Sequence, residues 1–301
     1  MQDLTNRVAV ITGAASGIGK GIAQQLAKEG MKLVLADIEE RPLVEAEKEL
    51  QAAGAHTLSI VTDVSKTESV YALADRTFAT FGNVHILCNN AGVSGGLGHV
   101  REIPQQDWEW IMAVNFSGVL YGIQAFVPRM IANNEEGVII NTTSTVGLTT
   151  GTTSAYGITK HAITRLTEGL HYDLQAAGSK LTAALLVPGA TATNILYADR
   201  NRPERLTVPC DEQAQATLTE RRRNLHKRIQ QLGMKPEEVG TIVVQAIKNR
   251  RFYILTDPER TKRLVRLRME GILDETAPII GTTKIPHLKE LFAKDSLGYS
   301  E

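Results

Sequence analysis

The sequence predicts an α/β fold with one doubly wound parallel sheet, and three observations support it. Short apolar runs rich in Val, Ile and Leu alternate with longer amphipathic segments along the 301 residues. The runs show little polar alternation, which is typical of strands covered on both faces. Glycines such as Gly30 and Gly54 follow amphipathic segments, where helices commonly end. This alternation of strand and helix favours right-handed crossovers and parallel pairing.

The elements are predicted in the following order. Buried strands are expected at residues 8–11, 33–36, 57–61, 86–88, 138–141, 183–187 and 252–255. Helices are expected at residues 17–29, 42–53, 65–81, 106–132 (as two helices), 155–177 and 258–273. The segment 194–233 breaks the alternation because it is polar, strongly charged and without a strand pattern. Since it follows the sixth strand, we expect it at the carboxyl edge of the sheet, where open α/β proteins bind ligands.

Length and composition indicate a single globular domain over residues 1–276, followed by a C-terminal tail at 277–301. Hydrophobic residues make up 43% and charged residues 22% of the chain, and 33 basic residues balance 33 acidic ones. This balance gives no electrostatic reason to expect nucleic acid or an anionic membrane as a partner.

Targeting and metal signals are not found in the sequence. We find neither a signal peptide nor an apolar stretch of the ~18–20 residues that span a bilayer. The two cysteines, Cys88 and Cys210, form no metal-ligand spacing, so we expect no metal. We therefore expect a cytoplasmic protein.

A glycine-rich turn, TGAASGIGK at residues 12–20, joins the first strand to the first helix. Such a turn lets the backbone approach a pyrophosphate, and the helix N-terminus offers unpaired N–H groups and a positive dipole end. Gly13 is expected to make the turn, Gly17 to permit the close approach and Gly19 to allow close helix packing. The spacing is G-x-x-x-G-x-G, which differs from the general dinucleotide fingerprint G-x-G-x-x-G.

Asp37 ends the second strand, about 20 residues beyond the turn. A carboxylate there accepts both ribose hydroxyls of NAD and repels the additional phosphate of NADP. Ala14 and Ala15 carry no charge that would bind this phosphate, whereas Arg41 is near enough in sequence to leave strict selectivity open. Capping of the next helix is the structural alternative for Asp37, and its position and context favour the cofactor role.

Two more strand ends are predicted to face the cofactor. Asp63, followed by Val64, comes after the third strand and is expected near the adenine, with helix capping as the alternative. Asn89-Asn90-Ala91-Gly92 ends the fourth strand, and its small residues would leave room for the cofactor to cross the sheet edge.

Tyr156 and Lys160 lie four residues apart in a helical segment, so their side chains share one helix face. A tyrosine pKa of about 10 is too high for a base at neutral pH. A nearby ammonium favours the phenolate and lowers this pKa, which makes the pair a proton-transfer unit. Ser144 lies twelve residues before Tyr156, where its hydroxyl would hydrogen-bond a carbonyl or alcohol oxygen. Asn115 lies in the helical stretch after the fourth strand.

In this order and spacing, the motifs resemble those of the classical short-chain dehydrogenases/reductases. The glycine turn and the Asn89–Gly92 stretch match that family's cofactor motifs, and the resemblance covers roughly residues 5–255. The matching catalytic tetrad is Asn115, Ser144 (followed by Gly147), Tyr156 and Lys160. Pro188-Gly189 followed by Thr193 matches the stretch that binds the nicotinamide carboxamide. The segment 194–233 is long for the family and the tail is additional.

The resemblance implies a seven-stranded Rossmann fold, usually in a homotetramer. It implies that Tyr156 transfers the substrate proton and that Ser144 steadies the substrate oxygen. Lys160 would bind the nicotinamide ribose and lower the pKa of Tyr156, and Asn115 would hold a water that links Lys160 to solvent. The residues expected to bind cofactor are Gly13, Ser16, Gly17, Ile18, Gly19, Asp37, Asp63, Val64, Asn90, Ala91, Gly92, Tyr156, Lys160, Pro188, Gly189, Thr191 and Thr193.

These motifs predict an NAD-dependent dehydrogenase that moves a hydride between NAD(H) and a secondary alcohol or ketone. The segment 194–233 would cover the substrate, and it resembles that of relatives that oxidise benzylic or bulky secondary alcohols, which favours a bulky or aromatic substrate. Leu148, Thr153 and Tyr197 are candidates for the pocket wall. One alternative is an NADP(H)-dependent carbonyl or 3-oxoacyl reductase, and another is a dinucleotide-binding regulatory protein without turnover. We expect a homo-oligomer, either tetramer or dimer, with no nucleic-acid or membrane partner.

Overall fold

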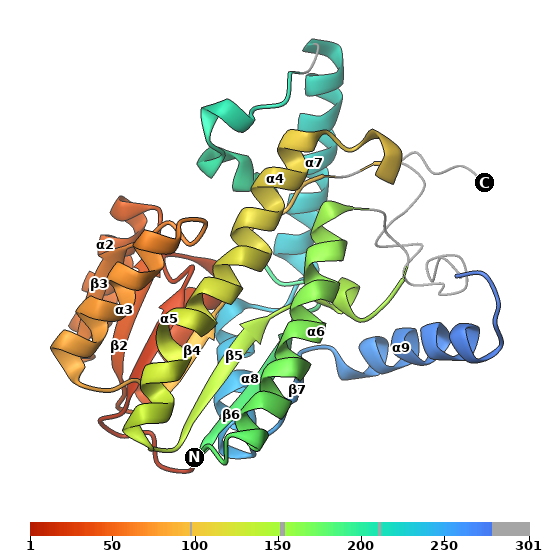
Figure 1. Cartoon of the computed structure of the whole chain (residues 1–301). Coiled ribbons are helices and arrows are strands. Elements are labelled where there is room, and N and C mark those ends of the chain that lie inside the picture. Colours follow the sequence, from red (N-terminus) through yellow and green to blue (C-terminus); the bar gives the residue numbers. More distant parts are fainter. Residues whose placement is uncertain (97, 151–153, 210–211, 279–301) are drawn as a thin grey trace.

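In the computed structural model, which describes residues 1–96, 98–150, 154–209 and 212–278, the chain forms one seven-stranded sheet. All strands are parallel, in the order β3-β2-β1-β4-β5-β6-β7 (Figure 1). The strands are β1 (Val8–Thr12), β2 (Lys32–Asp37), β3 (Thr57–Val61), β4 (Ile86–Asn89), β5 (Gly137–Thr142), β6 (Leu181–Val187) and β7 (Tyr253–Leu255). The order reverses between β1 and β4, so the predicted doubly wound sheet is confirmed.

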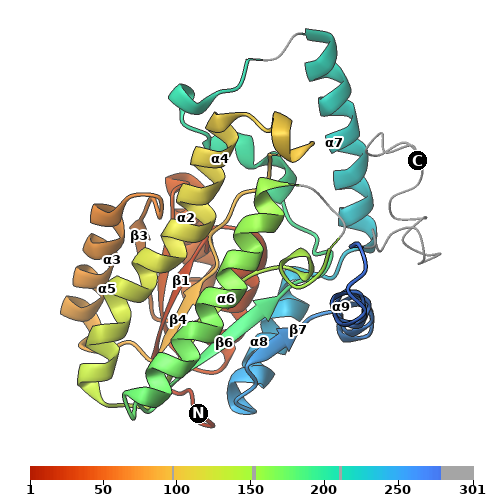
Figure 2. The ribbon, with the colours of Figure 1, turned by 45° about the vertical axis from the view of Figure 1, so that its right-hand side comes forward.

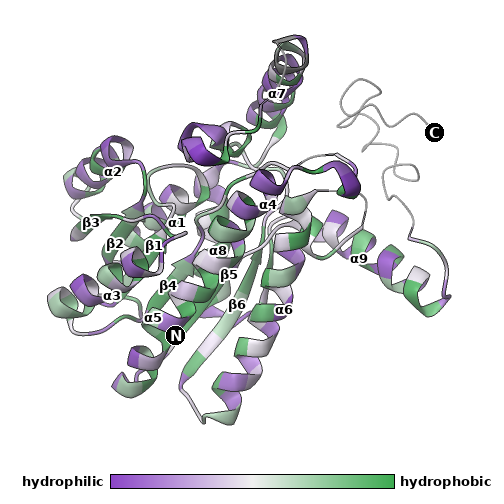
Figure 3. Cartoon of the chain, turned by 45° about the horizontal axis from the view of Figure 1, so that its top comes forward, coloured by the Kyte–Doolittle hydropathy of each residue, from purple (hydrophilic) through white to green (hydrophobic). Residues whose placement is uncertain are grey.

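Helices cover both faces of the sheet, which explains why its strands are apolar throughout. Val8 and Val10 of β1 pack toward one layer, whereas Ala9 and Ile11 pack toward the other. The first layer holds α3 (Thr67–Phe81), α5 (Gly118–Asn133) and α6 (Ala155–Ala176). The second holds α1 (Gly17–Lys28), α2 (Glu40–Ala52) and α8 (Pro236–Lys248). Figure 2 shows the strands enclosed between these helices, and Figure 3 shows that the strands are largely apolar.

Helix α8 is a feature that the sequence analysis assigned to no element. Its backbone touches that of α1: a Cβ at Gly21 would lie 2.2 Å from the carbonyl oxygen of Pro236, and one at Gly240 would lie 2.3 Å from that of Gly21. The two helices therefore approach each other more closely than any side chain would allow. This close contact fixes α1, and with it the glycine turn, against the rest of the domain.

The predicted helical region 106–132 is one continuous helical segment. It contains α4 (Gln105–Ile111), a π-helical turn (Met112–Ser117) and α5. Contrary to the expectation from sequence, residues Gln105–Asn133 are long and apolar enough to cross a membrane by composition, with a mean hydropathy of 1.4 over 18 residues. In the fold, α5 packs on β4, β5 and α3, which accounts for its apolar residues.

The segment 194–233 folds into two 3₁₀ turns (Ile195–Asn201 and Glu204–Leu206) and the long helix α7 (Glu212–Leu232). Its two ends meet, because Met234 N donates to Ala190 O (3.0 Å) and Ala192 N donates to Met234 O (2.9 Å). Helix α7 rises above the body of the domain (Figures 1 and 2). Helix α9 (Pro258–Leu273) follows β7 as predicted. The predicted tail lies almost entirely outside the described residues.

Candidate active site

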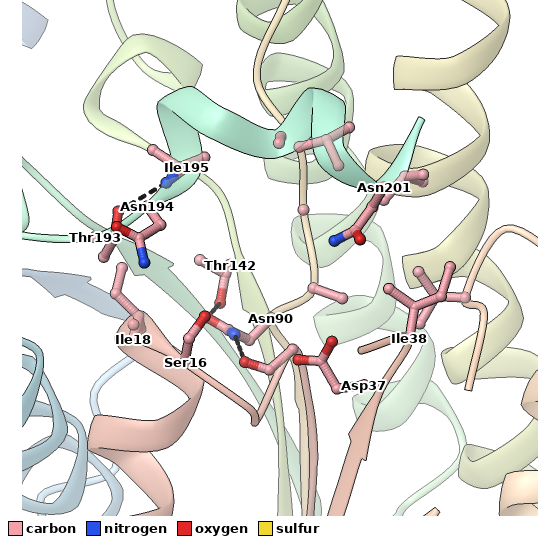
Figure 4. Close-up of a pocket in the computed structure, with 18 of the residues that line it drawn as sticks. Ser16, Ile18, Asp37, Ile38, Asn90, Thr142, Thr193, Asn194, Ile195 and Asn201 are labelled. Carbon is pink, nitrogen blue, oxygen red and sulfur yellow. Dashed lines mark hydrogen bonds between the residues drawn. The ribbon is translucent and has the colours of Figure 1, made fainter. Parts of the chain in front are cut away.

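A cavity of about 300 Å³ opens where strands β1, β2, β4, β5 and β6 end (Figure 4). It brings together all the predicted site residues except Gly19 and Asn115. Those that line it are Gly13, Ser16, Gly17, Ile18, Asp37, Asp63, Val64, Asn90, Ala91, Gly92, Ser144, Tyr156, Lys160, Pro188, Gly189, Thr191 and Thr193. Residues from seven separate stretches of the sequence thus meet in one space.

The floor of the cavity is fixed by hydrogen bonds between the ends of β1 and β4. The hydroxyl of Thr12 accepts from the backbone N–H groups of Asn90 (2.9 Å) and Ala91 (3.0 Å). The side-chain amide of Asn90 donates to the Thr12 carbonyl (2.9 Å). Because these groups are buried or partly buried, each bond holds the turn in one position relative to the neighbouring strand.

The glycines of the turn are required by its geometry. Gly13 (φ +67°) and Gly17 (φ +52°) adopt backbone angles that side chains disfavour. A Cβ at Gly13 would lie 2.9 Å from the Ala91 Cα, and one at Gly19 would lie 2.1 Å from the Gly13 carbonyl oxygen. Gly19 therefore lets the start of α1 pack on the turn itself.

The turn and Asp37 both line the cavity, where the sequence predicts a dinucleotide. Ser16 caps α1 without a side-chain hydrogen bond to the first turn, so the described side chains leave the N–H groups of that turn available to an anion. The two Asp37 oxygens accept from the N–H groups of Ala15 (3.0 Å) and Glu39 (3.1 Å), which fixes the carboxylate at the cavity wall. Burial raises the pKa of Asp37, while these two hydrogen bonds act in the opposite direction.

Asp63 stabilises the start of the next helix, as one of the two alternatives predicted, and its position near the adenine stays a prediction. It lines the cavity, and its Oδ1 atom also accepts from the N–H group (3.0 Å) and the hydroxyl (2.6 Å) of Ser65, just before α3. Lys66 Nζ lies 3.6 Å from its other oxygen. The carboxylate therefore shapes the start of the helix while it forms part of the wall.

Lys160 is almost fully buried, and its ammonium donates to the Thr142 carbonyl at the end of β5 (2.9 Å). Burial lowers the pKa of Lys160 to about 8. Its Nζ atom lies 5.5 Å from the centre of the Tyr156 ring. The two residues therefore share one helix face, as predicted from their spacing.

In the protein alone, burial raises the pKa of Tyr156, and the hydrogen bond with Ser144 lowers it to a smaller extent. The sequence-based expectation was a lowered pKa caused by Lys160. The difference arises because the Lys160 ammonium is directed at the Thr142 carbonyl, while the phenol sits in a poorly solvated position. Ser144, rather than Lys160, is the group that hydrogen-bonds the Tyr156 hydroxyl.

Asn115 lies behind the cavity wall, fully buried in the π-helical turn. Its Oδ1 atom accepts from Val93 N (2.8 Å), and its Nδ2 atom donates to Val93 O (3.0 Å) and to the Thr159 hydroxyl (3.2 Å). It therefore holds the loop after β4 in place. A Cβ at Gly92 would touch both Asn115 Oδ1 (3.3 Å) and Lys160 Nζ (3.4 Å), which shows how close the two polar groups lie.

An apolar wall, which the sequence analysis did not identify, completes the cavity. It is formed by Val93, Trp110, Val114, Ile195, Ala198, Pro203 and Ile229. Of the residues proposed for this wall, Leu148 and Tyr197 do not line the cavity, and Thr153 lies outside the described residues. Tyr197 instead packs against His226 of α7. Hydrophobic character alone could not reveal which of these side chains face inward.

Arg202 connects the segment 194–233 to α4 through an ion pair and a contact with an aromatic ring. Its guanidinium lies 4.2 Å from the centre of the Trp110 ring and 2.6 Å from an Asp107 oxygen. It also pairs with Asp199 (3.1 Å), which in turn pairs with Arg222 of α7 (2.6 Å). Part of the charge run 220–228, which the sequence suggested to be a solvated helix face, thus joins a network that orders the wall.

Arg41, the cation that left the cofactor selectivity open in the sequence, is directed at Glu45 instead of the cavity. Its side chain is 91% exposed and its Nε atom lies 3.1 Å from the Glu45 carboxylate. A different arginine, Arg200, reaches the Asp37 end of the cavity from the segment 194–233. Nothing local in the sequence connects Arg200 with this strand end.

The glycine turn, Tyr156 and the buried Lys160 meet at one sheet edge, an arrangement that favours an oxidoreductase with a dinucleotide cofactor. A family model described as short chain dehydrogenase matches residues 7–204. The chain therefore belongs to the short-chain dehydrogenase/reductase family, as the resemblance of its motifs predicted.

Two relatives can be aligned with this chain over more than nine-tenths of its length. A "CLA biosynthesis dehydrogenase/reductase" of Lactiplantibacillus plantarum is 33% identical over 92% of this chain and 97% of its own length. A "C alpha-dehydrogenase" of Sphingobium sp. strain SYK-6 is 31% identical over 93% of this chain and 89% of its own length.

Two solved structures bound to cofactors share the fold. A short-chain dehydrogenase/reductase from Burkholderia phymatum in complex with NAD is 40% identical, with a TM-score of 0.86 over 93% of this chain and 98% of that one. A metagenomic short-chain oxidoreductase in complex with NADP is 25% identical, with a TM-score of 0.64 over 84% of this chain and 97% of that one. Family membership therefore leaves the choice of cofactor to the residues of this chain.

Proposed function

We propose that this protein is an NAD-dependent dehydrogenase that moves a hydride between NAD(H) and a bulky, apolar secondary alcohol or ketone. One observation carries the proposal: Tyr156 and Ser144 line the same cavity as the glycine turn and Asp37. A proton-transfer group and a dinucleotide cradle therefore share one enclosed space. The NAD complex of the Burkholderia relative supports the choice of cofactor.

In this proposal the chain's own residues hold the dinucleotide at three points. The N–H groups of the turn before α1 bind the pyrophosphate, and Asp37 accepts the hydroxyls of the adenosine ribose. Lys160, fixed by Thr142, places a buried positive charge beside the nicotinamide ribose. When bound, the nicotinamide supplies the hydride acceptor for oxidation or the hydride donor for reduction.

Two hydroxyl groups, those of Ser144 and Tyr156, interact with the substrate oxygen. Ser144 donates a hydrogen bond to this oxygen and so holds the oxygen next to Tyr156. Tyr156 takes the hydroxyl proton as the C–H hydride leaves the alcohol carbon, and returns it in the reverse reaction. In the protein alone, the hydrogen bond between Ser144 and Tyr156 lowers the pKa of Tyr156 and so opposes the effect of burial on the phenolate.

The substrate class follows from the apolar wall. Trp110, Val114 and Ala198 line the cavity that Ser144 and Tyr156 enter, and a small polar alcohol would leave these side chains without contacts. A site of this kind gains binding free energy from each apolar group that it buries.

The experiment is a panel of secondary alcohols, from 2-propanol to benzylic and long-chain examples, tested with NAD and with NADP. Nicotinamide absorbance reports turnover, with the Tyr156→Phe variant as the control. We expect turnover with NAD that increases with apolar bulk and is lost in the variant. Turnover with NADP alone would favour the carbonyl or 3-oxoacyl reductase alternative, and cofactor binding without turnover would favour a regulatory role.

Three further predictions from the sequence belong to this proposal. The protein is expected to act in the cytoplasm and to assemble as a homo-oligomer, tetramer or dimer. The segment 194–233 is expected to cover the substrate. Analytical ultracentrifugation of the full chain tests the assembly directly.

A further inference from the structure

Arg200 and Glu39 form a two-pronged ion pair across one end of the cavity. Arg200 Nε lies 2.9 Å from one Glu39 oxygen and Nη2 lies 2.6 Å from the other, while Nη1 donates to the Tyr197 carbonyl (2.9 Å). The Glu39 and Arg200 side chains are only 21% and 39% exposed. Planar, two-point pairing of this kind is strong and geometrically specific.

The pair joins two segments that are 161 positions apart in the chain. Glu39 follows β2, two residues after Asp37, and Arg200 comes from the segment 194–233. Asp37, Ile38 and Asn201 line the cavity together with both partners, and Figure 4 shows Asn201 reaching from one wall toward Asp37 and Ile38 on the other. The pair therefore closes the end of the cavity that Asp37 assigns to the adenosine ribose.

The charge of Arg200 is available to a ligand only when its ion pair with Glu39 is broken. Asp37 and Glu39 raise the pKa of Arg200, with the hydrogen bond to Glu39 as the main cause, and Arg200 holds the pKa of Glu39 below its ordinary value. With Glu39 engaged, the charge of Arg200 is neutralised within the ion pair and two of its N–H groups are already occupied. Without Glu39, a guanidinium fork suited to phosphate would lie beside the ribose position.

We propose that Glu39 determines cofactor specificity by occupying Arg200, so that a latent site for a ribose 2′-phosphate stays closed and the site admits NAD in preference to NADP. This inference rests on the proposed role of Asp37, and it assigns to Glu39 and Arg200 a function beyond it. Asp37 repels the phosphate directly, whereas Glu39 withholds the cation that would bind it. Glu39 is thus a positioning residue for Arg200.

The test measures equilibrium binding of NADH and NADPH to the full-length protein by isothermal titration calorimetry, with competition against NADH where binding is weak. In Glu39→Gln, we expect NADPH affinity to rise about tenfold, the contribution of one charged hydrogen bond, while NADH affinity stays within about threefold. In Arg200→Gln, we expect NADPH affinity to fall, because two carboxylates then face the phosphate without a cation. Neither effect requires turnover.

The double variant separates release of Arg200 from simple removal of a negative charge. In the Arg200→Gln background, Glu39→Gln is expected to change NADPH affinity by less than about threefold. Glu45→Gln is the matched control, because it releases Arg41, an exposed arginine near the same strand end, and should leave both affinities unchanged. Thermal melting of each variant confirms that it is folded.

The outcomes distinguish this inference from the proposed function. If Glu39→Gln brings no gain for NADPH, or if the gain persists without Arg200, the latent phosphate site is contradicted. If the wild-type protein binds NADPH more tightly than NADH, NAD dependence is contradicted, whatever the variants do.

Discussion

The two halves of the cavity are held together by different forces. On the cofactor side, the ends of β1, β2 and β4 are joined by backbone contacts, the Thr12 hydroxyl and glycines that leave no room for a side chain. On the substrate side, the wall depends on the ion pair between Arg202 and Asp107, which connects the segment 194–233 to α4, and on the pair between Arg222 and Asp199 inside that segment. The first half is therefore expected to be rigid and intolerant of added atoms, and the second to be adjustable and sensitive to loss of charge.

The largest expected effect is at Gly19. A Cβ added by Gly19→Ala would lie 2.1 Å from the Gly13 carbonyl, so the turn or α1 must move. We expect dinucleotide affinity to fall by more than about a hundredfold, which is a loss of about 3 kcal/mol in binding free energy. Calorimetry with NADH measures it.

Gly169→Ala is the matched control. Gly169 lies in α6, and its nearest neighbour to an added Cβ is the flexible end of Arg165 at 3.9 Å. We expect unchanged binding and a gain of roughly 0.5–1 kcal/mol in the free energy of unfolding. Equal losses in both variants would contradict a special role for the turn.

Ser144→Ala is expected to act at the junction of the two halves. Loss of the hydroxyl removes a hydrogen bond to the substrate oxygen, and kcat/KM should fall by about a hundredfold. Because Ser144 lowers the pKa of Tyr156, its removal raises that pKa. Oxidation needs the deprotonated phenol, so the rise of kcat/KM with pH should move to higher pH. A pH profile that keeps its midpoint would contradict this link.

Arg202→Leu tests the substrate half alone. The Arg202 and Asp107 side chains are 11% and 14% exposed, so the variant leaves Asp107 unpaired in a poorly solvated place. We expect a loss of about 3 kcal/mol in the free energy of unfolding. The KM for a bulky alcohol should rise about tenfold, equivalent to 1.4 kcal/mol, while NADH affinity changes little.

The control for Arg202 is Arg205→Leu, which breaks the pair between Arg205 and Glu109. These side chains are 69% and 47% exposed, and the cost should stay below about 1 kcal/mol. Weakened NADH binding in Arg202→Leu would show that the two halves are not held independently.

The same division explains what could be predicted from sequence. The strands, the glycine turn and Asp37 are local patterns, since a buried strand is apolar throughout and the turn requires glycine at fixed spacings. Family resemblance then identified Asn115, Ser144, Tyr156 and Lys160 together. The roles of these residues remain predictions, although all but Asn115 line one cavity.

The substrate half could not be predicted in the same way, because it depends on pairs that are distant in the chain. Arg202 meets Asp107 and Arg200 meets Glu39 only after the segment 194–233 has folded over the sheet edge. Helix α8 carries buried residues at helical spacing, Val239, Val243 and Ile247. Its periodicity was therefore a signal in the sequence, whereas its backbone contact with Gly21 was not.

The measurement that tests the account most directly is the Tyr156→Phe variant, assayed for NADH binding and for oxidation of the best alcohol in the panel. The variant removes one hydroxyl from a site whose cofactor half does not depend on it. We predict NADH affinity within about threefold of wild type and a loss of turnover of roughly a thousandfold. Turnover near the wild-type rate would contradict proton transfer by Tyr156, and a joint loss of binding and turnover would contradict the separation of the two halves.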